Sequence, residues 1–521
     1  MLVGDIVRRN AEYFADDDAV VVPDQGPVSW AGLEQRTNQL ARSFAELGLE
    51  KGDRVSMLAP NGLEYLEFFF ACAKSGIIGA ALNVRLAPAE LTAYLGDIVE
   101  PRAILVHEQF NPLADAFLPE VGSIEHVVGI GVGHGRDLDY EQLLAAAPAS
   151  DPGVHIEDTD RYQLGATSGT TGVPKAAVLS HRNAIAAMLN WLADFQAPET
   201  STNLQNIPMF FNPGGPSGLH PVLMKGGRTV IFPSFEPGSF LRGVPQYGVT
   251  HSILVPTMIS MVVDHPDAAE HDLSSLLAVN CGGSPVPREL LKRARPVFGD
   301  VFHPIYGLAE TYSCGTILRP ENQYTEGTEA QVRRLSSVGK PKVLMDVRVV
   351  DSEGHDVPHD NESGGEVWMR GDTVSSGYFG MPEETAKSRE GEWFKTGDVA
   401  VVDEEGFISI VDRMKDIIIT GGINVYSRDV EEAIYDHPAV SQVAVIGVPH
   451  EKWGEAIHAV VVLAPGASAD EDELIEFASQ RLADYKKPRS LEVREELPLG
   501  GTGKILKKEL QAEFWSTGDA S

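Results

Sequence analysis

The chain has 521 residues and is therefore too long to fold around one compact core. Its residues are 43% hydrophobic and 22% charged, which is an ordinary globular composition. Acidic residues outnumber basic ones and give a formal net charge of −33. A surface of that sign repels nucleic acid and anionic lipid, so we expect no nucleic-acid partner and a local site for any polyanionic ligand.

Cysteine usage and hydrophobic patterning narrow the class further. The three cysteines form no CxxC pair, which excludes a disulfide framework and a cysteine-rich zinc site. The N-terminus lacks the apolar stretch of a secretory signal, and Glu67 and Lys74 interrupt the most apolar segment, 65–84. We therefore expect a cytoplasmic protein without a transmembrane segment. A homodimer stays open at this level.

Short β-branched runs alternate with amphipathic helical stretches through the first 280 residues. Strands separated by helices are typical of parallel α/β sheets that are buried on both faces. The first such series comprises strands at 55–59, 76–82 and 103–107, and helices at 62–74 and 88–94. Further strands are expected at 229–232, 250–255 and 277–280.

The pattern changes past about residue 335. Short strands at 346–350, 365–369 and 407–411, separated by Gly, Asp and Asn, indicate an antiparallel or barrel-like subdomain. A compact unit follows Lys415, with strands at 417–419, 442–448 and 457–463 and helices at 427–434 and 470–482. The predicted fold is thus α/β. A large N-terminal domain, 1–414, holds two α/β subdomains and a small β-barrel-like one, and a small α+β domain, 415–521, completes the chain.

The glycine-rich segment 129–135 invites comparison with a dinucleotide-binding loop. The G-x-G-x-x-G spacing fails, because His134 and Arg136 occupy the positions of the third glycine. We therefore expect a surface turn there.

The segment 166–181 gives the clearest indication of a functional site. Glycines let backbone N–H groups turn inward, hydroxyls add donors and a lysine adds one positive charge, which together predict a phosphate cradle. It is not a Walker A loop, because only two residues separate the first two glycines. The alternative is a polar loop without a ligand. The residues concerned are Thr167, Ser168, Gly169, Thr170, Thr171, Gly172 and Lys175.

This segment resembles the phosphate loop of the adenylate-forming superfamily, which includes acyl-CoA synthetases, aryl-CoA ligases, firefly luciferase and peptide-synthetase adenylation domains. Further motifs follow in family order, so the chain is identified as a member over essentially its whole length. These motifs are Tyr306-Gly-Leu-Ala-Glu310, Trp393–Asp398, Asp412–Asp416 with 419–426, and Gly501–Ile505.

The residue chemistry agrees with this resemblance. Attack of a carboxylate on an α-phosphate creates a highly anionic transition state, so positive charge and a metal must converge there. Glu310 suits Mg²⁺ as a hard oxygen ligand. The resemblance implies that Tyr306 stacks on adenine and Asp398 binds the ribose, while Arg413 assists at the ribose or phosphate. Its remaining nucleotide contacts are Gly282, Gly283, Ser284 and Gly307, and its catalytic residues are Thr171, Glu310 and Lys504.

Two half-reactions share this site in the family. Lys504 contacts the carboxylate and α-phosphate during adenylation only, so the small domain is expected to be mobile about a hinge near Lys415. After rotation, Gly421 and Gly422 would face the nucleotide and leave room for pantetheine.

Departures from the family pattern concern the acid. Ala176 follows Lys175 where Gly is usual, and Ala309 replaces a Thr, which removes a hydroxyl near the metal or acid. Phe211, followed by Asn212, stands where related ligases carry a His, and Ile305 stands where Gly opens the acyl channel. Phe211 and Ile305, both apolar, predict a hydrophobic and shortened acid pocket, which Gly307 and Ala309 are also expected to contact. The alternative is that Phe211 and Ile305 are ordinary core residues.

The expected reaction joins a carboxylic acid to ATP, giving acyl-AMP and pyrophosphate, and then transfers the acyl group to CoA. ATP, CoA and Mg²⁺ are the implied cofactors. A medium- or long-chain fatty acid is the expected substrate, with an aryl or alicyclic acid as the alternative. A catalytically silent adenylate-binding protein is the alternative from another class. No carrier domain fits after Lys504, which argues against a peptide synthetase, and a luciferase-type pocket has no sequence signal.

Overall fold

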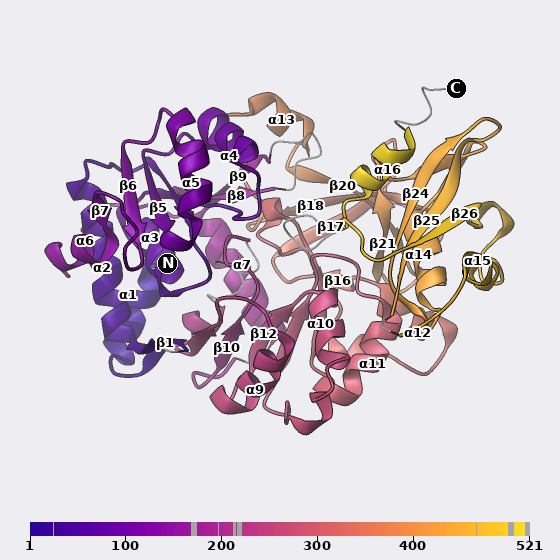
Figure 1. Cartoon of the computed structure of the whole chain (residues 1–521), viewed down its shortest axis with the longest axis horizontal. Helices are drawn as coiled ribbons and strands as arrows, with labels where there is room; N and C mark the ends of the chain where they lie inside the picture. Colours follow the sequence, from indigo (N-terminus) through magenta and orange to yellow (C-terminus); the bar gives the residue numbers. More distant parts are fainter. Residues whose placement is uncertain are drawn as a thin grey trace.

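The computed structural model describes residues 1–23, 25–167, 174–195, 197–211, 215, 221–464, 466–498 and 505–515. Several predicted site residues lie outside the described residues: Ser168, Gly169, Thr170, Thr171, Gly172, Asn212 and Lys504. Figure 1 shows a large body formed by most of the chain, with the orange and yellow C-terminal elements on one side of it.

The first α/β subdomain is built on a seven-stranded sheet with the order β7-β6-β5-β3-β4-β8-β9. Neighbouring strands are parallel except for the hairpin of β8 and β9. The strands are β3 (Arg54–Leu58), β4 (Ile78–Ala81), β5 (Ala103–His107), β6 (His126–Ile130), β7 (Leu138–Asp139), β8 (Arg161–Ala166) and β9 (Ala176–Ser180). The connecting helices include α2 (Trp30–Glu46), α3 (Leu63–Ser75), α4 (Pro88–Tyr94), α5 (Asn111–Phe117) and α6 (Tyr140–Ala146).

The second subdomain carries a nine-stranded sheet with the order β16-β15-β14-β13-β12-β10-β11-β1-β2. Its strands are β1 (Asp18–Val22), β2 (Gly26–Ser29), β10 (Thr202–Gln205), β11 (Arg228–Ile231), β12 (His251–Leu254), β13 (Ala278–Cys281), β14 (Phe302–Tyr306), β15 (Thr316–Ile317) and β16 (Lys340–Pro341). Its helices include α7 (His181–Asp194), α9 (Pro237–Tyr247), α10 (Pro256–Val263) and α11 (Arg288–Phe298), whereas α1 (Gly4–Tyr13) packs against α2 and α3 of the first subdomain.

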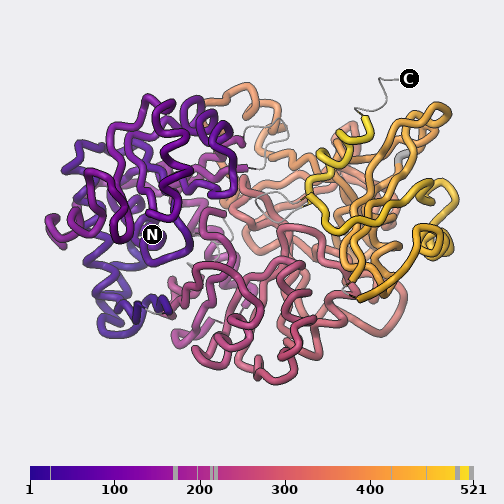
Figure 2. Tube along the Cα trace, in the orientation of Figure 1, coloured from indigo at the N-terminus to yellow at the C-terminus, as the bar shows by residue number. Residues whose placement is uncertain are grey.

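Two smaller sheets complete the chain. The first is antiparallel, with β17 (Met345–Val350), β18 (Gly365–Gly371), β19 (Arg389–Glu390), β20 (Trp393–Val402) and β21 (Ile408–Arg413). The second holds β22 (Ile418–Thr420), β23 (Ile423–Val425), β24 (Val440–His450), β25 (Gly454–Leu463) and β26 (Ser490–Arg494). Its helices are α14 (Ser427–Tyr435), α15 (Glu471–Ser479) and α16 (Lys507–Trp515). Figure 2 traces these last elements together, far from the indigo N-terminal segments.

The two α/β subdomains share their main hydrophobic core. Met57 and Leu58, adjacent in β3, belong to different buried clusters, so helices cover both faces of that sheet. The larger cluster also contains Trp191 of α7 and Ile231 of β11. A shared close-packed core fixes the two sheets relative to each other, and the predicted site lies along their junction.

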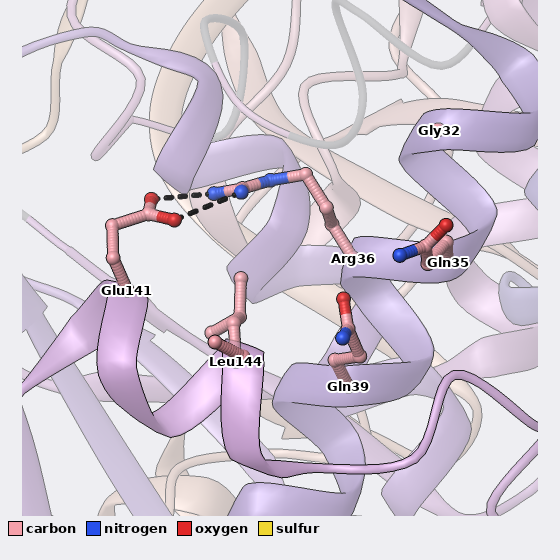
Figure 3. A pocket seen from close by; sticks show the side chains of 7 residues that line it. Gly32, Gln35, Arg36, Gln39, Glu141 and Leu144 are labelled. Atoms are coloured by element: carbon pink, nitrogen blue, oxygen red, sulfur yellow. Dashed lines mark hydrogen bonds and ion pairs between the residues drawn. The ribbon is translucent and has the colours of Figure 1, made fainter.

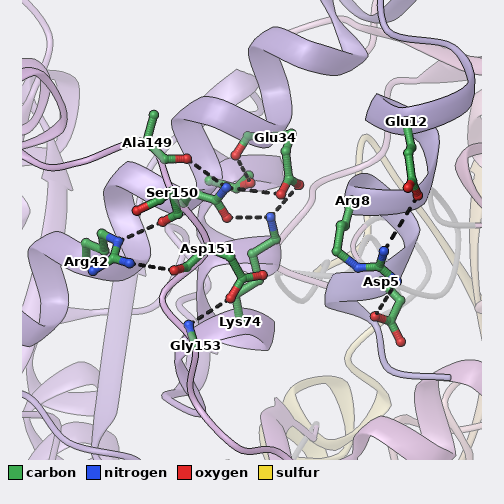
Figure 4. A network of polar contacts seen from close by, with 12 residues as sticks. Asp5, Arg8, Glu12, Glu34, Arg42, Lys74, Ala149, Ser150, Asp151 and Gly153 are labelled. Atoms are coloured by element: carbon green, nitrogen blue, oxygen red, sulfur yellow. Dashed lines mark hydrogen bonds and ion pairs between the residues drawn. The ribbon is translucent and has the colours of Figure 1, made fainter.

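Polar contacts tie the helices of the first subdomain to one another. Lys74 of α3 donates to Asn38 Oδ1 of α2 at 2.7 Å and also pairs with Glu34. Arg42 donates to the carbonyl oxygens of Ser150 and Asp151, which fixes the segment that leads into β8 (Figure 4). Nearby, Arg36 reaches Glu141 of α6 across a shallow hollow, as Figure 3 shows.

The fold class is confirmed, and the predicted elements fall close to the observed ones. The helix expected at 88–94 and the strand at 103–107 coincide with α4 and β5, whereas the helix expected at 470–482 ends at Ser479. Gly131, Gly133 and Gly135 all take positive φ after β6, as a surface turn requires. Within the described chain, every helix is too short or too polar to cross a membrane.

Candidate active site

The hairpin of β8 and β9 presents the predicted phosphate loop. Ala166 pairs with Ala176, and the Thr167 N–H donates to the Lys175 carbonyl at 2.8 Å, so both ends of the loop are held together. The Lys175 Nζ lies 2.6 Å from Glu384 Oε2 and 4.9 Å from the centroid of the Tyr378 ring. The lysine therefore stands over an aromatic face, beside one carboxylate.

Glu310 lies in a short 3-10 turn, η5 (Ala309–Thr311), just after β14. The Tyr378 hydroxyl donates to Glu310 Oε1 at 2.8 Å. Burial raises the pKa of the Glu310 carboxyl, while the hydrogen bond from Tyr378 acts in the opposite direction. Glycine is required at position 307, because a Cβ there would lie 2.5 Å from the Ser313 carbonyl carbon. The backbone thus folds back tightly around the acidic side chain.

Tyr306, Asp398 and Arg413 form one hydrogen-bonded group. The Tyr306 hydroxyl donates to Asp398 Oδ2 at 2.6 Å, and Arg413 Nε lies 3.1 Å from Oδ1. Asp398 and Arg413 are direct cross-strand partners in β20 and β21. Burial and the neighbouring Asp398 carboxylate raise the pKa of Tyr306, so its hydroxyl stays a donor. A buried carboxylate with these two partners keeps lone pairs for further donors.

Two glycines, Gly282 and Gly283, follow β13 and leave the backbone there without side chains. A Cβ on Gly282 would lie 2.8 Å from both the Ile305 carbonyl oxygen and Cγ1, and Gly283 has φ +85°. Gly283 is exposed, and Ser284, next in the chain, is partly buried. A backbone free of side chains lets a planar ring approach closely, as the predicted adenine contacts need.

Ile305 and Phe211 are both partly buried and pack against the main apolar cluster. The Phe211 ring centroid lies 4.4 Å from that of Phe210, and Ile305 occupies the space that a Cβ on residue 282 would need. Ala309, by contrast, lies in η5 beside Glu310. The structure therefore brings two of the predicted acid-contact residues to the same apolar cluster.

The predicted hinge lies between the two smaller sheets. Lys415 follows β21, is half-exposed and has Asp416 Oδ1 4.0 Å from its Nζ. Gly421 and Gly422 form the exposed β22–β23 turn with φ of +60° and +82°, and the Gly421 N–H donates to the Trp453 carbonyl. Among the hydrogen bonds of the described residues, none connects this turn to Glu310 or Asp398.

The C-terminal unit contacts the preceding sheet through α14. The Ser427 N–H donates to Asp412 Oδ2 at 2.6 Å, and Arg428 donates to the Ser336 carbonyl at 2.9 Å. Arg288 of α11 also pairs with Asp436. These contacts hold the unit in one orientation, in which the Gly421–Gly422 turn is exposed.

Sequence reasoning missed Tyr378 and Glu384. Their segment pairs with β9, where the Val178 N–H donates to the Gly377 carbonyl and the Phe379 N–H to the Ala176 carbonyl, both at 2.8 Å. Glu384 belongs to α13 (Pro382–Lys387). Pro382 signals that helix start in the sequence, but no local pattern predicts its pairing with Lys175.

Family models match nearly the whole chain. The model described as AMP-binding enzyme matches residues 7–379, and that of the AMP-binding enzyme C-terminal domain matches residues 429–504. The chain belongs to the AMP-binding enzyme family. The resemblance to the adenylate-forming superfamily is therefore confirmed for this AMP-binding enzyme.

Several relatives of this AMP-binding enzyme are named as acid–CoA ligases. A feruloyl-CoA synthase of Amycolatopsis sp. is 37% identical over 94% of each chain. The medium/long-chain-fatty-acid–CoA ligase FadD8 of Mycobacterium tuberculosis is 34% identical, over 93% of this chain and 85% of its own. The anthranilate CoA ligase AuaEII, solved with anthranoyl-AMP, superposes with a TM-score of 0.90 at 26% identity, covering 99% of this chain and 97% of its own. The expected enzyme class, an AMP-forming acyl-CoA ligase, agrees with these names.

Proposed function

We propose that this enzyme is an ATP-dependent acid–CoA ligase, which forms acyl-AMP and pyrophosphate and then passes the acyl group to CoA. The observation that carries the proposal is the convergence of four distant segments on one site. Lys175 and Glu310 both contact Tyr378, Glu310 is the fourth residue after Tyr306, and the Tyr306 hydroxyl donates to Asp398. The relatives named as acid–CoA ligases support the same chemistry.

Each side chain receives a role in ATP binding under this proposal. Asp398, fixed by Tyr306 and Arg413, accepts the ribose hydroxyls, and the ring of Tyr306 packs on adenine beside Gly282. Lys175 balances phosphate charge at the end of the β8–β9 hairpin. The predicted loop contacts and Lys504 remain proposals from the sequence motifs.

The residues present fit a magnesium ion that is shared with substrate phosphates. Among the described side chains, no cluster of three or more His, Cys, Asp or Glu is arranged as a metal cage. Mg²⁺ does not need one, because it commonly binds through one or two carboxylates plus phosphate oxygens and water. Glu310 is buried, and Tyr378 occupies only its Oε1. When bound there, Mg²⁺ would neutralise phosphate charge in the adenylation step.

The acid is proposed to be hydrophobic, and two classes have support. A medium- or long-chain fatty acid is supported by the apolar surroundings of Ile305 and Phe211 and by the likeness to FadD8. An aryl acid is supported equally, by the likeness to feruloyl-CoA synthase and to the anthranilate ligase. For either class, we propose that Ile305 beside Gly282 limits the size of the acid that the pocket accepts.

We also propose the domain alternation expected from the sequence, with the boundary at 414 and 415 and the hinge at Lys415. Its support is the position of Lys415 in the connection between β21 and β22, outside either sheet. Rotation there would carry the exposed Gly421–Gly422 turn toward the nucleotide. A homodimer and a cytoplasmic location stay predictions.

A panel of fatty, aryl and alicyclic acids tests the proposal, scored by ATP–pyrophosphate exchange without CoA and by AMP release with it. We expect exchange with at least one acid and AMP release only when CoA is added. Asp398→Ala should abolish both. Asp346→Ala, which removes a surface partner of Arg370 from the same sheet, should change neither. Nucleotide binding without exchange for any acid would instead identify a silent adenylate-binding protein.

A further inference from the structure

One side chain outside the recognised motifs joins two of them. Tyr378 donates its hydroxyl to Glu310 Oε1 at 2.8 Å, and its ring lies beneath the Lys175 Nζ, 4.9 Å from the centroid. The two contacts use different parts of the side chain, so one residue holds both groups at once. A lysine over an aromatic face is attracted by the ring quadrupole.

Backbone contacts fix the position of residue 378 without help from the side chains of Glu310 and Lys175. Residue 378 forms a β-bridge with Ala177, and its N–H donates to Thr385 Oγ1 at 2.9 Å. Gly377 takes φ +134°, and a Cβ there would lie 2.3 Å from Thr385 Cγ2. The Ser375 N–H also donates to the Glu310 carbonyl at 2.7 Å. The segment is thus attached on one side to β9 and on the other to η5.

The hydroxyl orients a carboxylate that has little solvent around it. Glu310 is 7% exposed, so without a donor its oxygens would face a costly desolvated environment. Donation to Oε1 leaves Oε2, to which no other described side chain donates, as the oxygen available to a cation. Lys175 meanwhile pairs with Glu384, whose side chain is 37% exposed, so an incoming phosphate must exchange with this carboxylate.

We propose that Tyr378 is a positioning residue of the adenylation half-reaction, with separable roles for its hydroxyl and its ring. The hydroxyl orients Glu310 toward a divalent cation, and the ring holds Lys175 at the end of the phosphate loop. This inference rests on the proposed function for the roles of Glu310 and Lys175. It predicts that loss of the hydroxyl affects metal-dependent ATP binding, whereas loss of the ring affects ATP binding without metal as well.

Two variants test the two roles. Tyr378→Phe removes only the hydroxyl, and Tyr378→Leu also removes the aromatic face. ATP binding is measured by calorimetry on the full chain, with Mg²⁺ and with chelator. For Tyr378→Phe, we expect the gain in affinity from Mg²⁺ to fall by about tenfold to a hundredfold, the size of one hydrogen bond to a charged group, and binding in chelator to stay within twofold. Tyr378→Leu should weaken binding in chelator too.

Tyr140→Phe is the matched control. Tyr140 donates to Glu67 Oε2 at 2.6 Å, a buried tyrosine–glutamate pair like that of Tyr378, but it belongs to α6, whose residues Glu141 and Leu144 line the hollow of Figure 3. This variant should lower the unfolding midpoint and leave the effect of Mg²⁺ on ATP binding unchanged.

The outcomes separate this inference from the proposed function. An unchanged Mg²⁺ effect in Tyr378→Phe, or a loss no larger than in Tyr140→Phe, overturns the role of the hydroxyl. Equal binding in chelator for the Phe and Leu variants overturns the role of the ring. If the wild-type enzyme binds Mg²⁺ and ATP but exchanges pyrophosphate with no acid, the proposed function fails while the binding data still decide on Tyr378.

Discussion

Ile305→Gly is the sharpest test of the acid pocket. Ile305 is partly buried at the end of β14, where its side chain packs against the main apolar cluster and its Cγ1 approaches the Gly282 backbone. Its backbone pairs with Ile317 in β15, and the substitution leaves that pairing possible. The change therefore removes apolar volume beside the proposed acyl site while the chain path is retained.

The magnitude follows from the atoms removed. Four side-chain carbons at about 0.8 kcal/mol each set an upper limit of about 3 kcal/mol for contacts to an acid. Because Ile305 is only partly buried, we expect about 1–3 kcal/mol, or about 10–200-fold in discrimination between acids. The preference should move toward longer or bulkier acids, and the KM for ATP should stay nearly unchanged, since Tyr306 and Asp398 keep their contact.

The assay compares kcat/KM across a series of acids of increasing length and ring size. Ile185→Ala is the control, because Ile185 of α7 is also partly buried against the same cluster but is not among the proposed acid contacts. It should lower stability without changing the order of substrates. An identical substrate profile for wild type and Ile305→Gly would refute the assignment of Ile305 to the acyl channel.

Three further outcomes are expected. Lys504→Ala should abolish acyl-AMP formation and spare thioester formation from supplied acyl-AMP, so equal loss in both half-reactions would contradict its role. Lys415→Pro restricts φ to about −65° and should have the opposite effect, so that adenylation is kept and thioester formation is mostly lost. Comparable rates of the two half-reactions in Lys415→Pro would argue against domain alternation. Burial lowers the pKa of His181 to about 4 in the folded chain. As the pH falls below about 6.5, the imidazole therefore takes up a proton in the unfolded chain but stays neutral in the folded chain, which favours unfolding. The free energy of unfolding should fall by about 3 kcal/mol between pH 6.5 and pH 4. Urea titrations at pH 7 and pH 4.5 should show a smaller fall for His181→Leu than for the wild type. An equal fall in both proteins would show that the pKa of His181 is not lowered by folding.

The sequence predicted the local structure well because its signals are local. Alternating β-branched runs gave β3, β5 and β12 to within one or two residues, and Pro88 marks the start of α4. The change to short strands after residue 335 anticipated the antiparallel sheet of β17–β21. The motifs around Tyr306, Glu310 and Asp398 likewise identified the superfamily before any packing was known.

Contacts between distant segments could not be predicted in this way. Tyr306 and Asp398 were assigned separate roles, yet they share a hydrogen bond across 92 residues of sequence separation. Strand register explains why these residues meet. The pairing of β20 with β21 places Asp398 opposite Arg413, and β14 ends at Tyr306, whose hydroxyl reaches the same Asp398 carboxylate. A motif records which residue types a reaction needs, and strand register decides which of them touch.

The sequence by itself determined the superfamily and the order of the elements, and it predicted the nucleotide-binding residues, because those depend on short patterns within one segment. Only the tertiary structure decided that Tyr378 stands between Lys175 and Glu310. Its segment joins β9 through three backbone hydrogen bonds, none of which involves the tyrosine side chain. Gly377 permits the backbone path, but main-chain pairing carries no side-chain signal that identifies the partner strand, so the position of Tyr378 follows from the packing of whole sheets.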